Sequence, residues 1–137
     1  RVPEEKKVKE VDQEGAKKLI DAAKEKGVKK FVMLSSMGAD NPEKADEIQE
    51  YLKAKHNADE YLKQIGIKYS IVRPGSLNNE DGKGKIELDN KLNKRGEIPR
   101  MDVAETLVGA LDDTIGKNKT FEILGGEVYI KAALEKI

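Results

Sequence analysis

The feature that most constrains this chain is the segment Val28 to Leu34, which ends in four consecutive apolar residues and follows a helical pattern closed by Gly27. A strand that is apolar on both faces is typical of a parallel sheet whose crossovers are helices. A second such strand is predicted over residues 69–72, and Pro74-Gly75 stops it. The sequence therefore predicts an α/β fold with helices on both faces of a parallel sheet.

Helices alternate with strands along the rest of the chain. Asp12 is predicted to cap the first helix, and Pro42 to open a long helix that reaches about Ile65 and is closed by Gly66. Asp102 is predicted to cap a later helix over residues 103–111. The other predicted elements are strands over 85–88 and 120–124 and a final helix over 130–137. The charged first ten residues are predicted to fray.

Composition excludes several classes of protein. The length of 137 residues suits one domain, 1–137, and 26 basic residues balance 26 acidic residues. A balanced charge gives no field that would attract nucleic acid or an anionic membrane. No apolar run is long enough to span a bilayer, no secretory pattern opens the chain, and cysteine is absent. These features predict a cytoplasmic protein without disulfides.

The residues with the clearest chemistry are two serines at a strand end and a Tyr-x-x-x-Lys pair. Ser35-Ser36 ends the first buried strand, at the edge where open α/β sheets bind ligands. Tyr51 and Lys55 are predicted on the following helix, inside the apolar stripe of Ile48, Leu52, Leu62 and Ile65, with Lys55 near its centre. With 22 lysines and four tyrosines in the chain, the Tyr-x-x-x-Lys spacing arises easily by chance. Only its place after the strand gives it weight.

Each of these residues has a chemical and a structural interpretation. A phenol with a pKa near 10 is a poor acid at neutral pH, and a neighbouring ammonium lowers that pKa. Tyr51 beside Lys55 would then exchange a proton while a serine binds a substrate carbonyl. In the structural interpretation Lys55 extends to solvent, Tyr51 covers the edge of the core, and the serines cap backbone groups.

Four segments, residues 15–36, 51–75, 98–108 and 119–126, resemble the short-chain dehydrogenases/reductases, specifically the atypical NmrA-like NAD(P)H-binding branch. They occur in the family order and cover almost the whole chain. The resemblance implies a Rossmann-like fold, NADP or NAD as cofactor and a small-molecule carbonyl or alcohol substrate.

The resemblance also implies a role for each matching residue. Ser36 would orient the substrate carbonyl, and Ser35 would line the cofactor side. Tyr51 would be the general acid or base, while Lys55 would bind the nicotinamide ribose and lower the phenol pKa. Pro74-Gly75 would pass close to the nicotinamide, where a glycine suits the close approach.

One part of the family pattern is missing. No G-x-G-x-x-G or similar glycine-rich phosphate loop occurs in the sequence, and by comparison with the family the first four strands are absent. We therefore expect these residues to be the carboxyl-terminal part of a longer protein. The strand over 31–34 would then present an open edge, which the missing half or another chain must cover.

Several residues carry weaker predictions. His56, the single histidine, has no partners at metal-ligand spacing and is predicted on the helix surface. Asp59 and Glu60 are predicted to pair with lysines of the same helix. Arg73 would anchor a carboxylate or phosphate, or form a structural salt bridge. The loop over 78–84 is either a substrate loop or a connecting turn.

Three functions stay open at this point. The first is an NAD(P)H-dependent oxidoreductase that uses Ser36, Tyr51 and Lys55. The second is an NAD(P)-binding redox sensor without turnover, and the third is a fragment or interaction module without cofactor affinity. The presence of all three side chains favours the oxidoreductase.

Overall fold

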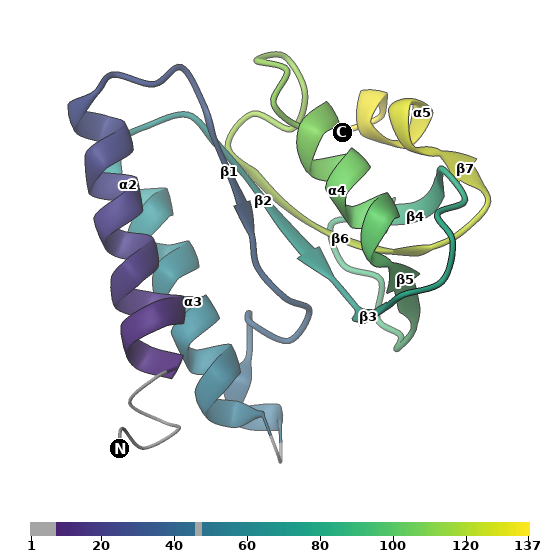
Figure 1. Cartoon of the computed structure of the whole chain (residues 1–137), viewed down its shortest axis with the longest axis horizontal. Coiled ribbons are helices and arrows are strands. Elements are labelled where there is room, and N and C mark those ends of the chain that lie inside the picture. Colours follow the sequence, from purple (N-terminus) through teal and green to yellow (C-terminus); the bar gives the residue numbers. More distant parts are fainter. Residues whose placement is uncertain (1–7, 46–47) are drawn as a thin grey trace.

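The computed structural model describes residues 8–45 and 48–137 (Figure 1). Within these residues no helix is both long and apolar enough to cross a membrane. The elements, in chain order, are η1 (Lys9–Gly15), α2 (Ala16–Glu25), β1 (Phe31–Leu34), η2 (Pro42–Lys44), α3 (Gln49–Ile65), β2 (Tyr69–Pro74), β3 (Ser76–Asn78), β4 (Lys85–Asp89), β5 (Glu97–Pro99), α4 (Arg100–Gly109), β6 (Lys119–Gly125), β7 (Val128–Tyr129) and α5 (Ile130–Glu135).

The main sheet has the strand order β1-β2-β6-β4-β7. The first three strands are parallel, and Leu34 lies opposite Val72 in the register of β1 with β2. The predicted α/β fold with a Rossmann-like sheet is confirmed, but the expectation of an all-parallel sheet is wrong because β4 is antiparallel to β6 and β7. In β4, polar and apolar residues alternate and only Ile86 is buried, which is the pattern of an antiparallel strand.

Helices cover both faces of the sheet (Figure 1). On one face, α2 and α3 pack against β1 and β2 around Ile20, Met33, Leu62 and Ile71. On the other face, α4 and α5 enclose a second core that is centred on Phe121 of β6. The carboxyl ends of β1 and β2 are therefore held between two packed layers.

The helix boundaries differ in part from the predicted ones. Gly27 and Gly66 adopt φ values of +69° and +92°, as expected of residues that end α2 and α3. Asp12 caps nothing, because it lies inside η1, a π-helical turn that continues into α2. Pro42 opens only the short 3₁₀ turn η2, and α3 begins at Gln49. Residues 46–47 of the predicted long helix and residues 1–7 of the segment predicted to fray lie outside the described residues. Residues 8–10 of that segment are helical.

Asp102 has a structural role other than the predicted cap. Helix α4 already begins at Arg100, and the Asp102 carboxylate is buried. It accepts hydrogen bonds from the backbone N–H groups of Lys83 at 3.1 Å and Gly84 at 2.8 Å. These bonds tie the loop over 78–84 to α4. The two short strands on either side of this region, β3 and β5, pair in parallel and were not predicted.

Strand β1 lies at one edge of the sheet. The N–H groups of Phe31 and Ser35 bond to carbonyl oxygens of the β2 side, Lys68 at 2.9 Å and Val72 at 2.7 Å. Backbone groups of alternate strand residues point to opposite sides, so those of Val32 and Leu34 face away from β2. Among the described residues no strand pairs with this side of β1. The expected open edge is present.

Candidate functional site

The carboxyl ends of β1 and β2 bring the predicted serines next to Pro74-Gly75. The hydrogen-bond ladder continues beyond β1, because the N–H of Met37 donates to the carbonyl oxygen of Pro74 at 2.9 Å. Ser36 therefore follows β1 as an extended neighbour of the last residues of β2. In open α/β sheets this end of the strands is where ligands bind.

Gly75 is required by the packing of the protein itself. A Cβ atom at this position would lie 2.4 Å from Cδ2 of Leu124 and 2.6 Å from the carbonyl oxygen of Gly96. The Gly75 N–H donates to the carbonyl oxygen of Ile123 at 3.1 Å, which fixes the turn against β6. The residue type is thus explained by close internal contacts, and an approach to a nicotinamide stays a prediction.

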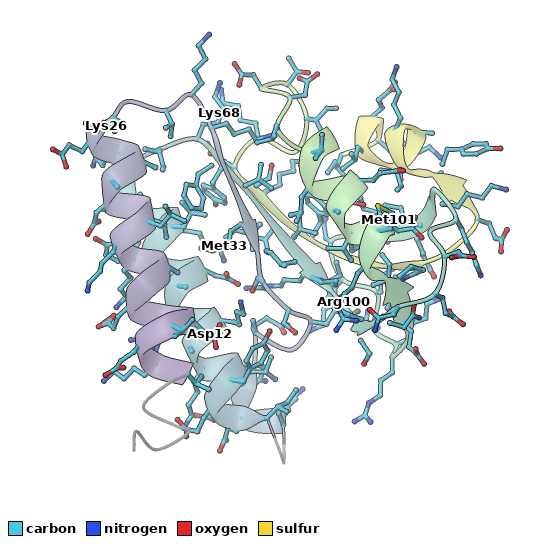
Figure 2. The ribbon with its side chains drawn as sticks, in the orientation of Figure 1. Asp12, Lys26, Met33, Lys68, Arg100 and Met101 are labelled. Carbon is cyan, nitrogen blue, oxygen red and sulfur yellow. The ribbon has the colours of Figure 1, made fainter. Side chains whose placement is uncertain are left out.

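Tyr51 and Lys55 lie together at the start of α3. The Lys55 Nζ is 5.4 Å from the centroid of the Tyr51 ring, which is within cation–π range. The same ammonium lies 3.9 Å from Oδ1 of Asp12, and the side chains of Lys55 and Asp12 are 16% and 27% exposed. Figure 2 shows Asp12 beside the first turns of α3. Sequence reasoning did not include Asp12 in the site.

The expected direction of the Tyr51 pKa is wrong for this arrangement. Burial of the half-buried phenol raises its pKa above the ordinary value of 10.0, and the negative charge of Asp12 raises it further. The Lys55 ammonium contacts the face of the ring and is shared with Asp12. Tyr51 therefore keeps its proton throughout the neutral range.

The two serines differ in what their hydroxyl groups do. The Ser35 side chain is buried, and its Oγ donates to Oδ2 of Asp59 at 2.6 Å. The Ser36 side chain is half-buried and donates a long hydrogen bond of 3.3 Å to the carbonyl oxygen of Met37. Ser36 can exchange this weak local bond for one to a ligand, whereas Ser35 is held by Asp59.

Asp59, the partner of Ser35, forms a buried ion pair with Arg73. The sequence predicted a possible salt bridge for Arg73 but not its partner. Asp59 does not pair with a surface lysine, as was expected, since it is fully buried. Its Oδ2 accepts hydrogen bonds from Nη2 of Arg73 at 3.0 Å and from Nε at 3.2 Å. The structural salt bridge considered for Arg73 is thus confirmed. Asp59 is four residues after Lys55, so the two residues share a helix face. This spacing was the sequence signal that Asp59 could lie near the predicted site.

Other predicted residues lie outside the site. Glu60 pairs with Lys63 at 3.0 Å, as predicted. The His56 ring is half-buried, and its Nδ1 lies 2.7 Å from the carbonyl oxygen of Ala39. Two hollows, of about 380 Å³ beside β4 and α5 and about 320 Å³ beside β3 and β5, are lined by residues other than Ser36, Tyr51 and Lys55.

Comparison with known proteins identifies the class of this chain. Residues 4–114 match the model of an NAD(P)H-binding family, so the chain belongs to that family, whose cofactor is NADPH or NADH. It is 41% identical to an uncharacterised sugar epimerase, YhfK, of Bacillus subtilis over 128 residues, which are 93% of this chain and 59% of that protein. It is 39% identical to sanguinarine reductase of Eschscholzia californica over 126 residues, 83% of this chain and 45% of that enzyme.

Solved structures give the same fold. A Bacillus halodurans protein named as an NAD-dependent epimerase/dehydratase superposes with a TM-score of 0.94 at 35% identity, over 98% of this chain and 64% of that one. The oxidoreductase ylbE of Lactococcus lactis gives a TM-score of 0.84 at 34% identity, over 95% and 61%. The chain thus spans about half to two thirds of the length of these relatives. The chain is therefore part of an NAD(P)H-binding family, some of whose members are named as oxidoreductases and others as epimerases.

Proposed function

We propose that this protein is an NAD(P)H-dependent oxidoreductase of the short-chain dehydrogenase/reductase type, in its NmrA-like branch, and that it reduces a small carbonyl compound. The observation that carries the proposal is the contact of Lys55 with the Tyr51 ring at the start of α3, the first α-helix after Ser36 in the chain. Sanguinarine reductase, a relative at 39% identity, is named as a reductase.

The residues present fit the nicotinamide end of the cofactor. Lys55 would bind the nicotinamide ribose, and the turn at Pro74-Gly75 would lie beside the nicotinamide ring. The Lys55 side chain is only partly exposed, and its ion pair with Asp12 is at the outer distance limit for such a pair, so hydroxyl groups can compete for the ammonium. The pyrophosphate has no glycine-rich loop in this chain to hold it. That part of the cofactor must be bound by other polypeptide.

Each site residue has a defined step. When bound, NAD(P)H would supply a hydride for the carbonyl carbon. Ser36 donates a hydrogen bond to the carbonyl oxygen and orients it. Tyr51 transfers its phenolic proton to that oxygen as the C=O π bond breaks, which yields an alcohol and a phenolate. Lys55 stabilises the phenolate until it regains a proton from water.

Burial raises the pKa of Tyr51, so the phenol holds the proton that carbonyl reduction needs, but it is a weaker acid than an ordinary phenol. A phenol that is protonated throughout the neutral range is ready to act as an acid, whereas alcohol oxidation needs a phenolate. A redox sensor is the second candidate, and it is favoured only if Lys55 stays paired with Asp12 when cofactor is bound, because the ammonium is then less available to a phenolate.

The first experiment is a fluorescence titration of NADPH, and separately of NADH, into a sample of verified mass, followed by assays of NADPH oxidation with aldehydes, ketones and quinones. We expect saturable binding and turnover. Replacing Tyr51 by Phe should lower turnover by about 10²- to 10⁴-fold with the cofactor Kd unchanged. Tyr61→Phe is the matched control, because Tyr61 lies on the same helix with an exposed hydroxyl that bonds to Asp21.

The outcomes separate the candidates. Binding without turnover on any acceptor supports the sensor. Turnover that persists in Tyr51→Phe overturns the assigned chemistry, and absence of binding indicates a fragment whose site residues are idle.

We further propose that other polypeptide, either the missing half of the sheet or another chain, covers the open edge of β1. The unpaired backbone groups of Val32 and Leu34 and the exposed Leu34 side chain support this proposal. Sedimentation of the purified chain should detect association or aggregation. A folded, monodisperse monomer would overturn the proposal. A cytoplasmic location also stays a prediction.

A further inference from the structure

The strongest observation outside the proposed chemistry is the position of the buried carboxylate of Asp59. Asp59 has no exposed surface. On an α-helix it lies about 6 Å along the axis from Lys55 and about 12 Å from Tyr51, on nearly the same face. The carboxylate therefore points to the sheet from the helix that carries both proposed catalytic residues.

One oxygen atom of this carboxylate connects three separate elements. Oδ2 belongs to α3 and accepts hydrogen bonds from Ser35, just after β1, and from two nitrogen atoms of Arg73 in β2. The other oxygen, Oδ1, is buried and has no hydrogen-bond partner among the described residues. Within the part of the chain that the structure describes, the hydrogen bonds of this carboxylate are thus all directed at the ends of the two strands.

Each donor immediately precedes a residue of the proposed site. Ser35 precedes Ser36, and Arg73 precedes Pro74-Gly75. Movement of Asp59 would therefore shift the proton donor on α3 relative to the strand ends that bind the carbonyl and the nicotinamide. A displacement of about 1 Å between such groups can lower a rate by about 100-fold.

Stability alone gives little reason for this arrangement. Burying a carboxylate and a guanidinium is costly, and well-packed apolar residues in their place are often as stabilising or more so. Ala58 and Leu62 of the same helix belong to an apolar cluster with Met33 and Ile71, which such residues could extend. A hydrogen-bonded ion pair, in contrast, fixes distances and directions.

We infer that Asp59 is a positioning residue, which holds α3 against the ends of β1 and β2 so that Tyr51 and Lys55 face Ser36. The inference rests on the proposed function for its catalytic consequence. The clamp itself, defined as the side chains of Ser35, Asp59 and Arg73, is testable without any turnover.

The test compares Asp59→Asn with Lys30→Met. Lys30 is the matched control, because it is also a buried charged residue next to β1 but lies at the opposite end of the strand, where it bonds to carbonyl oxygens. Ser35→Ala is a milder second variant that removes a single donor of the clamp. All are assayed below their unfolding temperatures by NADPH oxidation with the acceptor that serves the wild type best.

We expect Asp59→Asn to lower kcat by about 10- to 100-fold with the KM for NADPH nearly unchanged, and Ser35→Ala to lower kcat by a smaller factor. Lys30→Met should leave kcat unchanged. A wild-type kcat in Asp59→Asn overturns the inference. An equal loss of kcat in Lys30→Met and Asp59→Asn also overturns it. If Asp59→Asn does not fold, a wild-type kcat in Ser35→Ala overturns it.

A second readout separates failure of this inference from failure of the proposed function. Hydrogen exchange at the amides of Ser35 and Met37 reports the ladder between the strand ends. Asp59→Asn, or Ser35→Ala if the first variant is unfolded, should accelerate this exchange by at least about tenfold, whereas Lys30→Met should not. If the wild type shows no turnover, the proposed function fails, and unchanged exchange would also overturn the clamp.

Discussion

The two ends of strand β1 each hold a buried charge and use it in different ways. At the amino end, the Lys30 ammonium donates to the backbone carbonyl oxygens of Ala110, Asp112 and Ile115. All three protons of the ammonium have acceptors, and these hydrogen bonds satisfy carbonyl oxygens at and just after the carboxyl end of α4. At the carboxyl end, Asp59 uses one oxygen for three donors and leaves the other without a partner in the described part of the chain.

Burial perturbs both charges in the direction that disfavours ionisation. It lowers the pKa of Lys30, against the opposing effect of Asp112 and Asp113. It raises the pKa of Asp59, although the hydrogen bond from Ser35 and the charge of Arg73 oppose the change. Three polar partners therefore do not fully replace water at either end. The two charges differ in what they bind. Lys30 binds backbone at the end of a helix, whereas Asp59 binds side chains beside a proposed active site.

The largest effect on stability is expected from Arg73→Met. This variant leaves the Asp59 carboxylate buried without its cation, which costs about 3–5 kcal/mol of unfolding free energy. Urea denaturation followed by circular dichroism measures the loss. Adding Asp59→Leu should recover much of it, because the double variant holds no unpaired charge. A loss below about 1 kcal/mol in Arg73→Met would mean that Asp59 is reached by water or accepts a proton readily.

A smaller loss, of about 1–3 kcal/mol, is expected from Lys30→Met. The variant deprives three carbonyl oxygens of a donor, but it leaves no isolated charge, and methionine fills most of the space of the lysine stem. Urea denaturation under the same conditions gives the comparison. If Lys30→Met proves more destabilising than Arg73→Met, the buried charge at the amino end of β1 contributes more to stability than the ion pair at its carboxyl end.

The same two ends show what the sequence could and could not predict. Glycine at positions 27 and 66 marked helix ends correctly, because a left-handed conformation is a local requirement. The apolar runs marked the parallel strands. Partners of buried charges are not local: Ser35 is 24 residues from Asp59, and Arg73 is 14 residues away. The pKa direction of Tyr51 was missed for the same reason, since both its burial, the larger cause, and the charge of Asp12 on a different helix arise from tertiary packing.

The smallest expected effect concerns the titration of Tyr51. Asp12→Asn removes an anion that raises the phenol pKa, so the pKa should fall, while the larger effect of burial remains. Tyrosinate absorbance, taken as the difference between each protein and its Tyr51→Phe form, measures this pKa. Asp21→Asn is the control, because Asp21 raises the pKa of Tyr61 on the same helix and should leave Tyr51 unaffected.

The sign of the change also fixes its effect on reactivity. Carbonyl reduction needs the protonated phenol, so the wild-type rate should persist until the pH approaches the raised pKa and should fall above it. In Asp12→Asn this alkaline decline should move to lower pH, and the rate of alcohol oxidation, which needs the phenolate, should rise at a given pH.

The pKa shift of Tyr51 is also linked to stability. The folded protein holds the Tyr51 proton more tightly than the unfolded chain does, so this contribution to the free energy of unfolding is present below pH 10 and is lost as the pH rises through the folded pKa. An unchanged titration would mean that Asp12 acts on Lys55 alone, and Tyr51 would then be governed by burial, as Lys30 and Asp59 are.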